Sequence, residues 1–243
     1  MSVDPPPVAP SRRRRWRYWL LRIAGAAVLV AIGLVVLWLT TWPDVGVLAS
    51  SFPQTTAFIE RDRAKGVKVR WRPVGYDEIA DELKLAVLVA EDINFFSHAG
   101  FDTSEISNAA REAIEGKRVR GASTLTQQLA KNLWLSPEKT AWRKLEEAVL
   151  TWRLERSLTK RRILELYLNV VQFGPGTYGA AAASSRYFGV PPSQLSADQA
   201  AQLAASLPRP SSWNPGSSSA GYARHVDRIR GRMERATWLN RLL

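Results

Sequence analysis

An uncharged apolar run near the N-terminus constrains this chain more than any other feature. No charged residue occurs between Ile23 and Pro43, and a helix needs about 20 mostly apolar residues to cross a bilayer. Aromatic residues flank the run, as interfacial belts do, at Trp16, Tyr18, Trp19, Trp38 and Trp42. We therefore expect one transmembrane helix over residues 19–42, preceded by a disordered basic tail over residues 1–18.

The arginines that precede this run indicate its orientation. By the positive-inside rule the basic flank is cytoplasmic, and everything after about Pro43 lies outside. A cleaved signal peptide is the alternative. The run is long for the apolar region of a signal peptide, and no clear small-x-small cleavage site follows it. A retained single-pass anchor is the favoured interpretation.

The rest of the composition fits a folded, basic protein. Apolar residues make up 46% of the 243 residues, which is enough for a sizeable core. The formal net charge is +12, of which six arginines and one aspartate in the first 22 residues supply +5. The remainder is still basic and favours an anionic partner such as phosphate, pyrophosphate or a lipid headgroup. The absence of cysteine excludes disulfides and thiol catalysis.

Residues 43–75 give weak signals, and we interpret them as a linker. Val67, Val69 and Trp71 alternate with basic residues, which predicts one short strand or simply a basic extended segment. Residues 76–243 show helical periodicity without an internal repeat, so we expect one compact, mainly α-helical unit. Within it, Thr159 and Ser196 are predicted to cap helices, and a basic terminal helix is expected from about Gly221 to Leu243.

Two adjacent acids end the first helical segment of this unit. Apolar residues recur at helical spacing before them, at Ile79, Leu83, Ala86, Val87 and Ala90. This pattern predicts a helix from about Asp77 to Glu91 with one buried face. Glu91 would then face an open, partly apolar cleft from a rigid element, a setting that makes a carboxylate a useful proton acceptor. The structural alternative is a solvated acidic helix end.

A second segment combines apolar spacing with amides and hydroxyls. Ser123 is predicted to cap a helix that buries Leu125, Leu129 and Leu133. Polar residues occupy its other faces, namely Thr124, Gln127, Gln128, Lys131 and Asn132. Such donors near a helix N-terminus could bind sugar hydroxyls and phosphate oxygens. A polar solvent-exposed face is the alternative. The basic, glycine-bracketed segment from Lys117 to Gly121 before it suits an anionic ligand or a solvated surface loop.

A third segment carries a stripe of charges. Ser136 and Pro137 form a typical helix start. The helix that follows is expected to bury Ala141, Leu145, Ala148, Val149 and Trp152. Lys139, Arg143 and Glu147 recur every four residues and therefore share one face. They are either ordinary surface ion pairs or, if they face the cleft of Glu91, cations for a phosphate together with a second carboxylate.

Taken together, these segments resemble the peptidoglycan glycosyltransferase family, which includes monofunctional enzymes and the glycosyltransferase domains of class A penicillin-binding proteins. The first family motif is matched by Glu91, Asp92, Phe95, His98 and Gly100. The second is matched by Gly121, Ser123, Thr124, Thr126, Gln127, Gln128, Lys131 and Asn132. The remaining three are matched by Arg143, Lys144 and Glu147; by Ile163, Leu164, Tyr167, Leu168 and Asn169, continued by Gly174 and Gly179; and by Tyr187, Phe188 and Gly189. The chain stops where a transpeptidase would follow, so the monofunctional type is expected.

The resemblance implies a lysozyme-like helical domain with a membrane-facing jaw, which residues 43–75 would enter. It implies polymerisation of lipid II into β-1,4-linked glycan, with inversion and release of undecaprenyl pyrophosphate. Glu91 would act as the base and Glu147 would assist at the leaving group, by orienting cations or by holding a divalent ion. Lys131, Arg143, Lys144 and Lys139 would neutralise the pyrophosphate. His98 matches a position that looks structural.

The remaining expectations concern cofactors, partners and location. No cofactor is required, although a divalent cation such as Mg²⁺ at the pyrophosphate stays open. Expected partners are lipid II, the growing glycan strand, inner-membrane lipid, and penicillin-binding transpeptidases and division proteins, but not nucleic acid, because the arginine cluster is explained by topology. The expected location is the bacterial inner membrane, with the N-terminus cytoplasmic and the catalytic domain periplasmic. A lytic muramidase and a catalytically silent scaffold are the rival functions.

Overall fold

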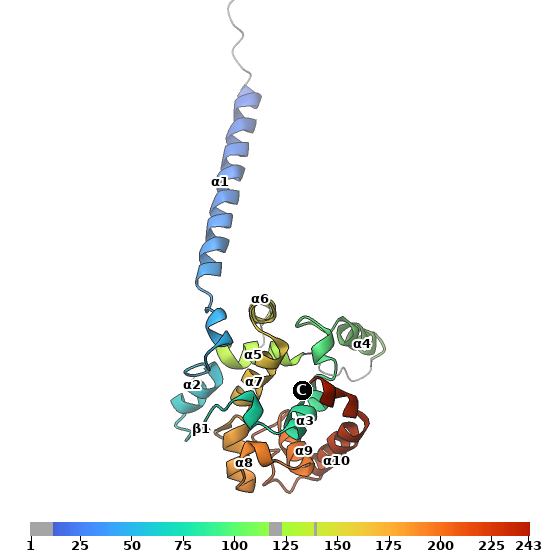
Figure 1. The fold of residues 1–243 in the computed structure, drawn as a ribbon. Helices are drawn as coiled ribbons and strands as arrows, with labels where there is room; N and C mark the ends of the chain where they lie inside the picture. Colours follow the sequence, from blue (N-terminus) through green and yellow to red (C-terminus); the bar gives the residue numbers. More distant parts are fainter. Residues whose placement is uncertain (1–11, 117–122, 139) are drawn as a thin grey trace, which may run out of the picture. The chain divides into compact units, whose positions relative to one another are not determined.

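The computed structural model describes residues 12–116, 123–138 and 140–243 (Figure 1). It divides into two compact units, Met1–Asp44 and Val45–Leu243. Three sets of predictions lie outside the described residues: most of the N-terminal tail, the basic segment from Lys117 to Gly121, and Lys139.

The first unit consists of one long helix, α1 (Arg12–Thr40). Its segment Trp16–Trp38 spans 23 residues and is long and apolar enough to cross a membrane. The side chains described within it are almost all exposed, as a lipid-facing helix requires, because it has no protein core to pack against. The predicted transmembrane helix is therefore confirmed as an element, although it begins before residue 19 and ends two residues before residue 42.

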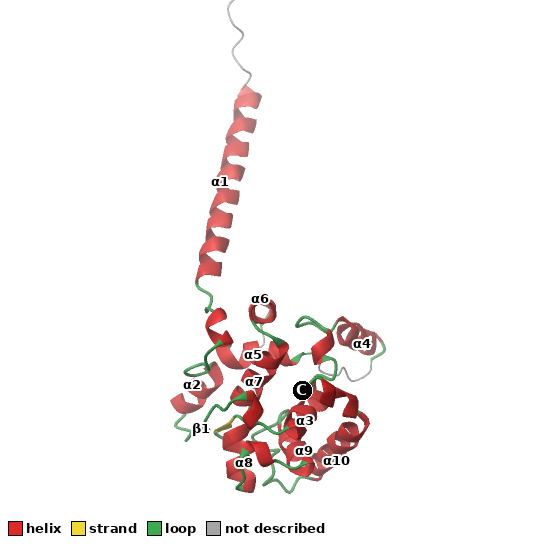
Figure 2. Cartoon of the chain, viewed as in Figure 1, coloured by secondary structure: helices red, strands yellow, loops and turns green. Residues whose placement is uncertain are grey.

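The second unit is mainly helical, as predicted, and Figure 2 shows how little of it is strand. Its α-helices are α2 (Ala57–Ala64), α3 (Asp81–Glu91), α4 (Thr103–Ile114), α5 (Leu125–Trp134), α6 (Ala141–Ser157), α7 (Lys160–Val170), α8 (Ala180–Phe188), α9 (Ala197–Ser206) and α10 (Ala220–Arg235). Short 3₁₀ helices cover Gly46–Ala49, Tyr76–Glu78, Phe95–Ser97, Pro192–Gln194 and Thr237–Arg241.

A small sheet joins the start of this unit to its middle. It holds β1 (Arg70–Trp71), β2 (Gln172–Gly174) and β3 (Thr177–Tyr178) in the order β1-β3-β2, with β1 parallel and β2 antiparallel to β3. The expected strand is thus shorter than the alternation from Val67 to Trp71. At the start of this alternation the Val67 N–H donates to the carbonyl of Asp62 in α2 (3.0 Å) rather than to a neighbouring strand.

Helix α3 lies in the core and packs against α9 and α10, while α5 packs against α6 and α7. Every residue of α3 from Leu83 to Val89 is buried. Lys84 is tolerated there because its ammonium donates to Asp81 (2.8 Å) and lies 4.0 Å from the centre of the Tyr76 ring. A helix held on all sides in this way fixes the position of the residue at its end.

Several predicted boundaries differ from the structure. Helix α3 begins at Asp81 rather than at about Asp77, because the chain first forms a 3₁₀ turn and then extends through Ile79. The C-terminal helix ends at Arg235 and is followed by a 3₁₀ helix rather than continuing to Leu243. Two predicted helix caps are confirmed: Thr159 accepts the Arg162 N–H (3.2 Å), and Ser196 accepts that of Gln199 (3.3 Å).

The largest correction concerns α6. Ser136 and Pro137 do not begin this helix. It begins at Ala141, and the Thr140 hydroxyl caps it by accepting the Arg143 N–H (3.1 Å). The predicted buried face is also wrong. Leu145 is 48% and Trp152 is 53% exposed, Ala141 is exposed, and Ala148 and Val149 are half-buried. The buried residues are instead Glu147, Leu150, Thr151 and Leu154.

Candidate active site

Glu91 is the last residue of α3, and the core packing of this helix holds it in place. Asp92 leaves the helix in an extended conformation after its N–H closes the last turn on the Leu88 carbonyl (2.9 Å). Glu91 remains partly exposed and lines a cavity of about 410 Å³. The predicted placement of Glu91 at the tip of a core helix is therefore confirmed.

Several groups act on the charge of Glu91. Burial is the largest effect and raises the pKa of its carboxyl group, and the negative charge of Asp92 adds to that increase. A hydrogen bond from Gln128 and the positive charge of Lys131 lower the pKa, but the net direction is upward. The Gln128 amide donates to Glu91 Oε2 at 2.8 Å. A carboxylate with a raised pKa is a stronger base than an ordinary glutamate.

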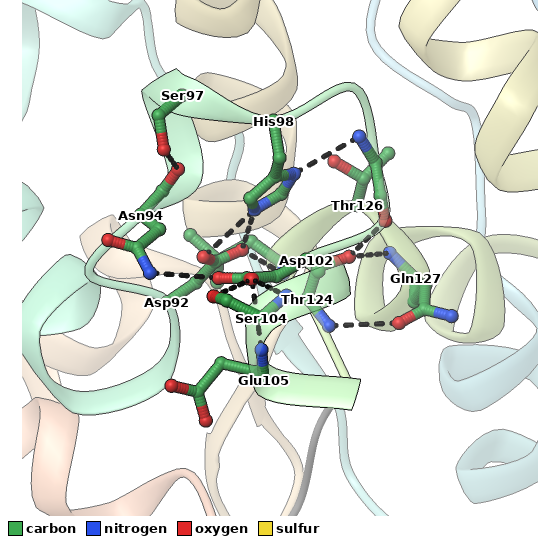
Figure 3. A network of polar contacts seen from close by, with 12 residues as sticks. Asp92, Asn94, Ser97, His98, Asp102, Ser104, Glu105, Thr124, Thr126 and Gln127 are labelled. Carbon is green, nitrogen blue, oxygen red and sulfur yellow. Dashed lines mark hydrogen bonds and ion pairs between the residues drawn. The ribbon is translucent and has the colours of Figure 1, made fainter. Parts of the chain in front are cut away.

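The residues that follow Glu91 form a polar network that joins three segments of the chain (Figure 3). The Asp92 carboxylate accepts the buried Leu125 N–H at the start of α5 (2.9 Å) and lies 3.0 Å from His98 Nε2. The Gly100 N–H donates to His98 Nδ1 (3.1 Å), so the ring proton lies on Nε2 and points to Asp92. His98 therefore connects backbone to carboxylate and has a structural role.

Asp102 completes this network. It accepts hydrogen bonds from the Asn94 amide (2.9 Å), from the Ser104 N–H (2.9 Å) and hydroxyl, and from the Glu105 N–H (3.0 Å). Burial alone would raise the pKa of Asp102, but these hydrogen bonds outweigh it and lower the pKa to about 2. Asp92, His98 and Asp102 offer ligand atoms within 4.8 Å of one another. Hydrogen bonds within the protein account for this cluster, because Asp92 links the end of α3 to the start of α5 and Asp102 links Asn94 to the start of α4.

Helix α5 starts one residue later than predicted. Thr124, not Ser123, caps it: its hydroxyl accepts the Gln127 N–H (3.3 Å) and donates to the Gly100 carbonyl (2.7 Å). The Gln127 side chain completes a capping box by accepting the Thr124 N–H (3.0 Å). Thr124 and Gln127 are both buried, whereas Ser123 is exposed. Thr124 and Gln127 therefore position α5, whereas Ser123 lines the cavity.

The other predicted residues of α5 differ in their surroundings. Asn132 is buried, and its amide donates to the Gln128 carbonyl (2.9 Å). Lys131 is partly exposed. Burial is the largest effect on Lys131 and lowers the pKa of its ammonium group. The charge of Glu147 raises it, those of Arg143 and Lys144 lower it, and that of Glu91 raises it. The net direction is downward.

Glu147 lies within a cluster of cations on α6. The residue is only 3% exposed, and its carboxylate lies 3.1 Å from Arg143 Nη1 and accepts a second hydrogen bond from the Lys144 ammonium. Glu147 and Glu91 both raise the pKa of Lys131, so both predicted carboxylates act on the charge of this lysine, and of the two it is Glu91 that lines the cavity. The predicted stripe of Arg143 and Glu147 is present, and its third member, Lys139, lies outside the described residues.

Sequence reasoning missed several polar residues of the cavity, namely Asn94, Asp102, Glu105 and Arg232. Arg232 on α10 lines it together with Glu91, Asn94, Glu105 and Gln128, and it donates to the Val89 carbonyl near the end of α3 (2.8 Å). Arg232 is exposed and lies one residue before Met233 of the buried face of α10, so helical periodicity places it off that face. Nothing in the sequence indicated that α10 would pack against the end of α3.

Comparison with known proteins identifies what this site resembles. Residues 60–234 match the family model described as Transglycosylase. A biosynthetic peptidoglycan transglycosylase of Azoarcus sp. (strain BH72) is 42% identical over 226 residues, which cover 90% of this chain and 95% of that protein. A protein of the same description from Nitrosospira multiformis is 38% identical over 227 residues, 93% of this chain and 98% of that protein. One from Alcanivorax borkumensis is 54% identical over 160 residues, 65% of this chain and 64% of that protein.

Proposed function

This chain belongs to the transglycosylase family and is a peptidoglycan glycosyltransferase, and from that premise we propose that it polymerises lipid II into β-1,4-linked glycan strands. The observation that carries the proposal is that Glu91 lines a cavity and has a raised pKa, while Arg143 and Lys144 flank Glu147 on α6 and both carboxylates act on the charge of Lys131. Glu91 suits the activation of a hydroxyl nucleophile, and the cations Lys131, Arg143 and Lys144 suit an anionic leaving group.

In the proposed reaction, Glu91 removes the proton from the acceptor's 4-hydroxyl as its oxygen attacks the anomeric carbon of the donor. The new C–O bond forms while the bond from that carbon to pyrophosphate breaks, and the electron pair leaves with undecaprenyl pyrophosphate. An α-linked donor gives a β-linked product in one displacement, so the reaction inverts configuration without a covalent enzyme intermediate. Glu91 ends the step protonated and returns the proton to solvent.

The leaving pyrophosphate gains negative charge as the bond breaks, and fixed cations stabilise that charge without reorganising. Lys131, Arg143 and Lys144 are proposed for this role. Glu147 orients two of them, because its buried carboxylate is bonded to both Arg143 and Lys144. This cluster favours synthesis over lytic cleavage of glycan, because a muramidase releases a sugar hydroxyl and has no anionic leaving group to neutralise.

We propose that no resident metal is needed at Glu147. Both of its oxygens already accept hydrogen bonds from cations, so a divalent ion would have to displace Arg143 or Lys144. The donor set therefore fits cation orientation better than metal binding, and no step is assigned to a metal. An ion that arrives with the pyrophosphate would add to these charges.

The membrane is the proposed site of action, since the chain carries an N-terminal helix able to span it. By the positive-inside rule the N-terminus is cytoplasmic and the catalytic unit periplasmic, at the inner membrane. Helix α6 exposes Trp142, Leu145 and Trp152, a surface that suits lipid and the undecaprenyl chains of the substrate. Penicillin-binding transpeptidases and division proteins are the proposed protein partners.

The deciding experiment is polymerisation of labelled lipid II by the detergent-solubilised full chain, with and without EDTA. We expect glycan strands in both conditions, and from the Glu91→Gln variant polymerisation that is at least about 100-fold slower. Incubation with intact sacculi is the second arm, and soluble muropeptides there would identify a lytic enzyme instead. Polymerisation by Glu91→Gln at the parental rate would refute the assignment of the base.

A further inference from the structure

A chain of hydrogen bonds runs from the protein core to Glu91. The Tyr167 hydroxyl lies 2.9 Å from Gln128 Oε1, and Gln128 Nε2 lies 2.8 Å from Glu91 Oε2. The three residues come from α7, α5 and α3. Gln128 thus spans the distance between a tyrosine and the proposed base.

Tyr167 is suited to act as a permanent hydroxyl. It is completely buried, with no exposed surface. Burial, followed by the charges of Glu91 and Asp92, raises the pKa of its phenol well above the ordinary tyrosine value. The phenol therefore keeps its proton throughout the pH range in which a carboxylate titrates. A protonated phenol can both donate and accept a hydrogen bond.

The direction of each hydrogen bond follows from the chemistry of Glu91. An ionised carboxylate only accepts, so the amide must turn its NH₂ group to Glu91 and its oxygen to Tyr167, which then donates. Once Glu91 has taken up a proton it can donate. The amide can then present its oxygen to Glu91 and its NH₂ group to the Tyr167 oxygen.

We propose that Tyr167 is a positioning residue for catalysis, which acts through Gln128 to hold a donor on the ionised form of Glu91 and lets the amide reverse when Glu91 is protonated. This inference rests on the proposed role of Glu91 as the base. Hydrogen bonds in such a series polarise one another, so the phenol strengthens the amide donor. We call the series of hydrogen bonds from Tyr167 through Gln128 to Glu91 the relay. It counteracts the effect of burial, which raises the pKa of Glu91.

The other charges that act on Glu91 do not depend on the phenol. Lys131 on α5 lowers its pKa and Asp92 at the end of α3 raises it. Removal of the Tyr167 hydroxyl leaves both in place and weakens only the donor to the carboxylate. The pKa of Glu91 must then rise, and the acidic limb of the activity profile must move to higher pH.

The test measures the Glu91 carboxyl pKa by ¹³C NMR titration of the full chain in detergent, with the resonance identified by its loss in Glu91→Gln. A net hydrogen bond of about 0.5–1.5 kcal/mol corresponds to roughly 0.4–1 pH unit, so Tyr167→Phe should raise the pKa by about that amount. Tyr178→Phe is the matched control. Tyr178 is also fully buried, but its hydroxyl bonds to Asp62 (2.7 Å), so this variant should leave the pKa of Glu91 unchanged.

Gln128→Met keeps the chain length and removes the amide, and it tests the relay even if Tyr167→Phe folds poorly. It should raise the Glu91 pKa at least as much as Tyr167→Phe, and adding Tyr167→Phe to it should give no further shift. An unchanged pKa in Tyr167→Phe, or an equal extra shift in the Gln128→Met background, would overturn the relay. If the NMR pKa moves but the pH profile of polymerisation does not follow, the relay stands and Glu91 is not the base.

Discussion

Replacement of Glu147 by glutamine should weaken the fold and the activity together. The side chains of Glu147 and Arg143 are only 4% and 12% exposed, so their ion pair is buried. Removal of one charge from a buried pair typically costs about 3–5 kcal/mol. Lys144 is 52% exposed, and solvent screens its contribution. Because the glutamine oxygen still accepts one hydrogen bond, we expect the lower end, about 3 kcal/mol.

Thermal unfolding of the full chain in detergent measures this cost. For a chain of 150–250 residues, 1 kcal/mol shifts Tm by about 2–4 °C, so Tm should fall by roughly 6–12 °C. Glu146→Gln is the control. It removes the same charge from the neighbouring residue of α6, outside the cluster of Arg143 and Lys144, and it should leave Tm nearly unchanged, as surface substitutions usually do.

The same variant should lose activity for two reasons. Arg143 and Lys144 lose the carboxylate that orients them, and Lys131 loses the charge that most raises its pKa. The Lys131 ammonium then loses its proton at a lower pH, so activity should decline earlier on the alkaline side. We expect kcat to fall by about 10²–10³-fold, the typical loss for one electrostatic stabiliser. A Glu147→Gln variant with parental Tm and parental polymerisation rates would refute this reasoning.

Variants at three further places in the molecule test other parts of the reasoning. Glu91→Gln should reduce lipid II polymerisation by about 10²–10⁴-fold. Because the folded protein has the raised Glu91 pKa, parental stability should fall as pH rises from the ordinary glutamate pKa through the raised one. The variant should therefore unfold at a higher temperature than the parent at about pH 8 but not at about pH 4. Arg232→Ala should raise KM for lipid II about tenfold, with a smaller change in kcat, the size expected from one charged hydrogen bond; an unchanged KM would remove Arg232 from the substrate site. In vesicles with brominated lipid, Trp142→Phe with Trp152→Phe should remove clearly more than twice the fluorescence quenching lost in the exposed control Trp238→Phe, because membrane contact buries interfacial tryptophans; a loss of twice or less, which the number of tryptophans alone explains, would contradict lipid contact by α6.

The position of Glu91 could be predicted because local and global signals agree there. The apolar spacing before it marks a core helix, and the next residue, Asp92, ends that helix by bonding to the N–H of Leu125, 33 residues later in the chain. The same agreement explains the correct caps at Thr159 and Ser196. In each case one hydroxyl residue precedes a clear helical pattern, so only one register was available.

The start of α5 shows where such reasoning fails. Ser123 and Thr124 are adjacent and both suit an N-cap, so the sequence offered two registers. The choice is made by a tertiary contact, the hydrogen bond from the Thr124 hydroxyl to the Gly100 carbonyl. Arg232 was missed for a similar reason. Its contact with the Val89 carbonyl joins residues 143 positions apart, and helical periodicity carries no information on which helix a given face meets.

The error in α6 has a different cause, and it bears on function. Hydrophobic periodicity identifies the face of a helix that avoids water, and in a water-soluble protein that face is the core. In α6 the apolar face with Leu145 and Trp152 points outward, and the opposite face buries Glu147 against α5. An acid can replace a leucine in that interface because Arg143 and Lys144 neutralise it. Leu150 and Leu154 are buried on the same side as Glu147, so α6 is apolar on its inner face and on part of its outer face. Exposed tryptophans and leucine on a helix that already packs against the core are unfavourable in water alone, and they become favourable where lipid covers them. The second apolar face of α6 is therefore an argument that this enzyme works at the membrane surface.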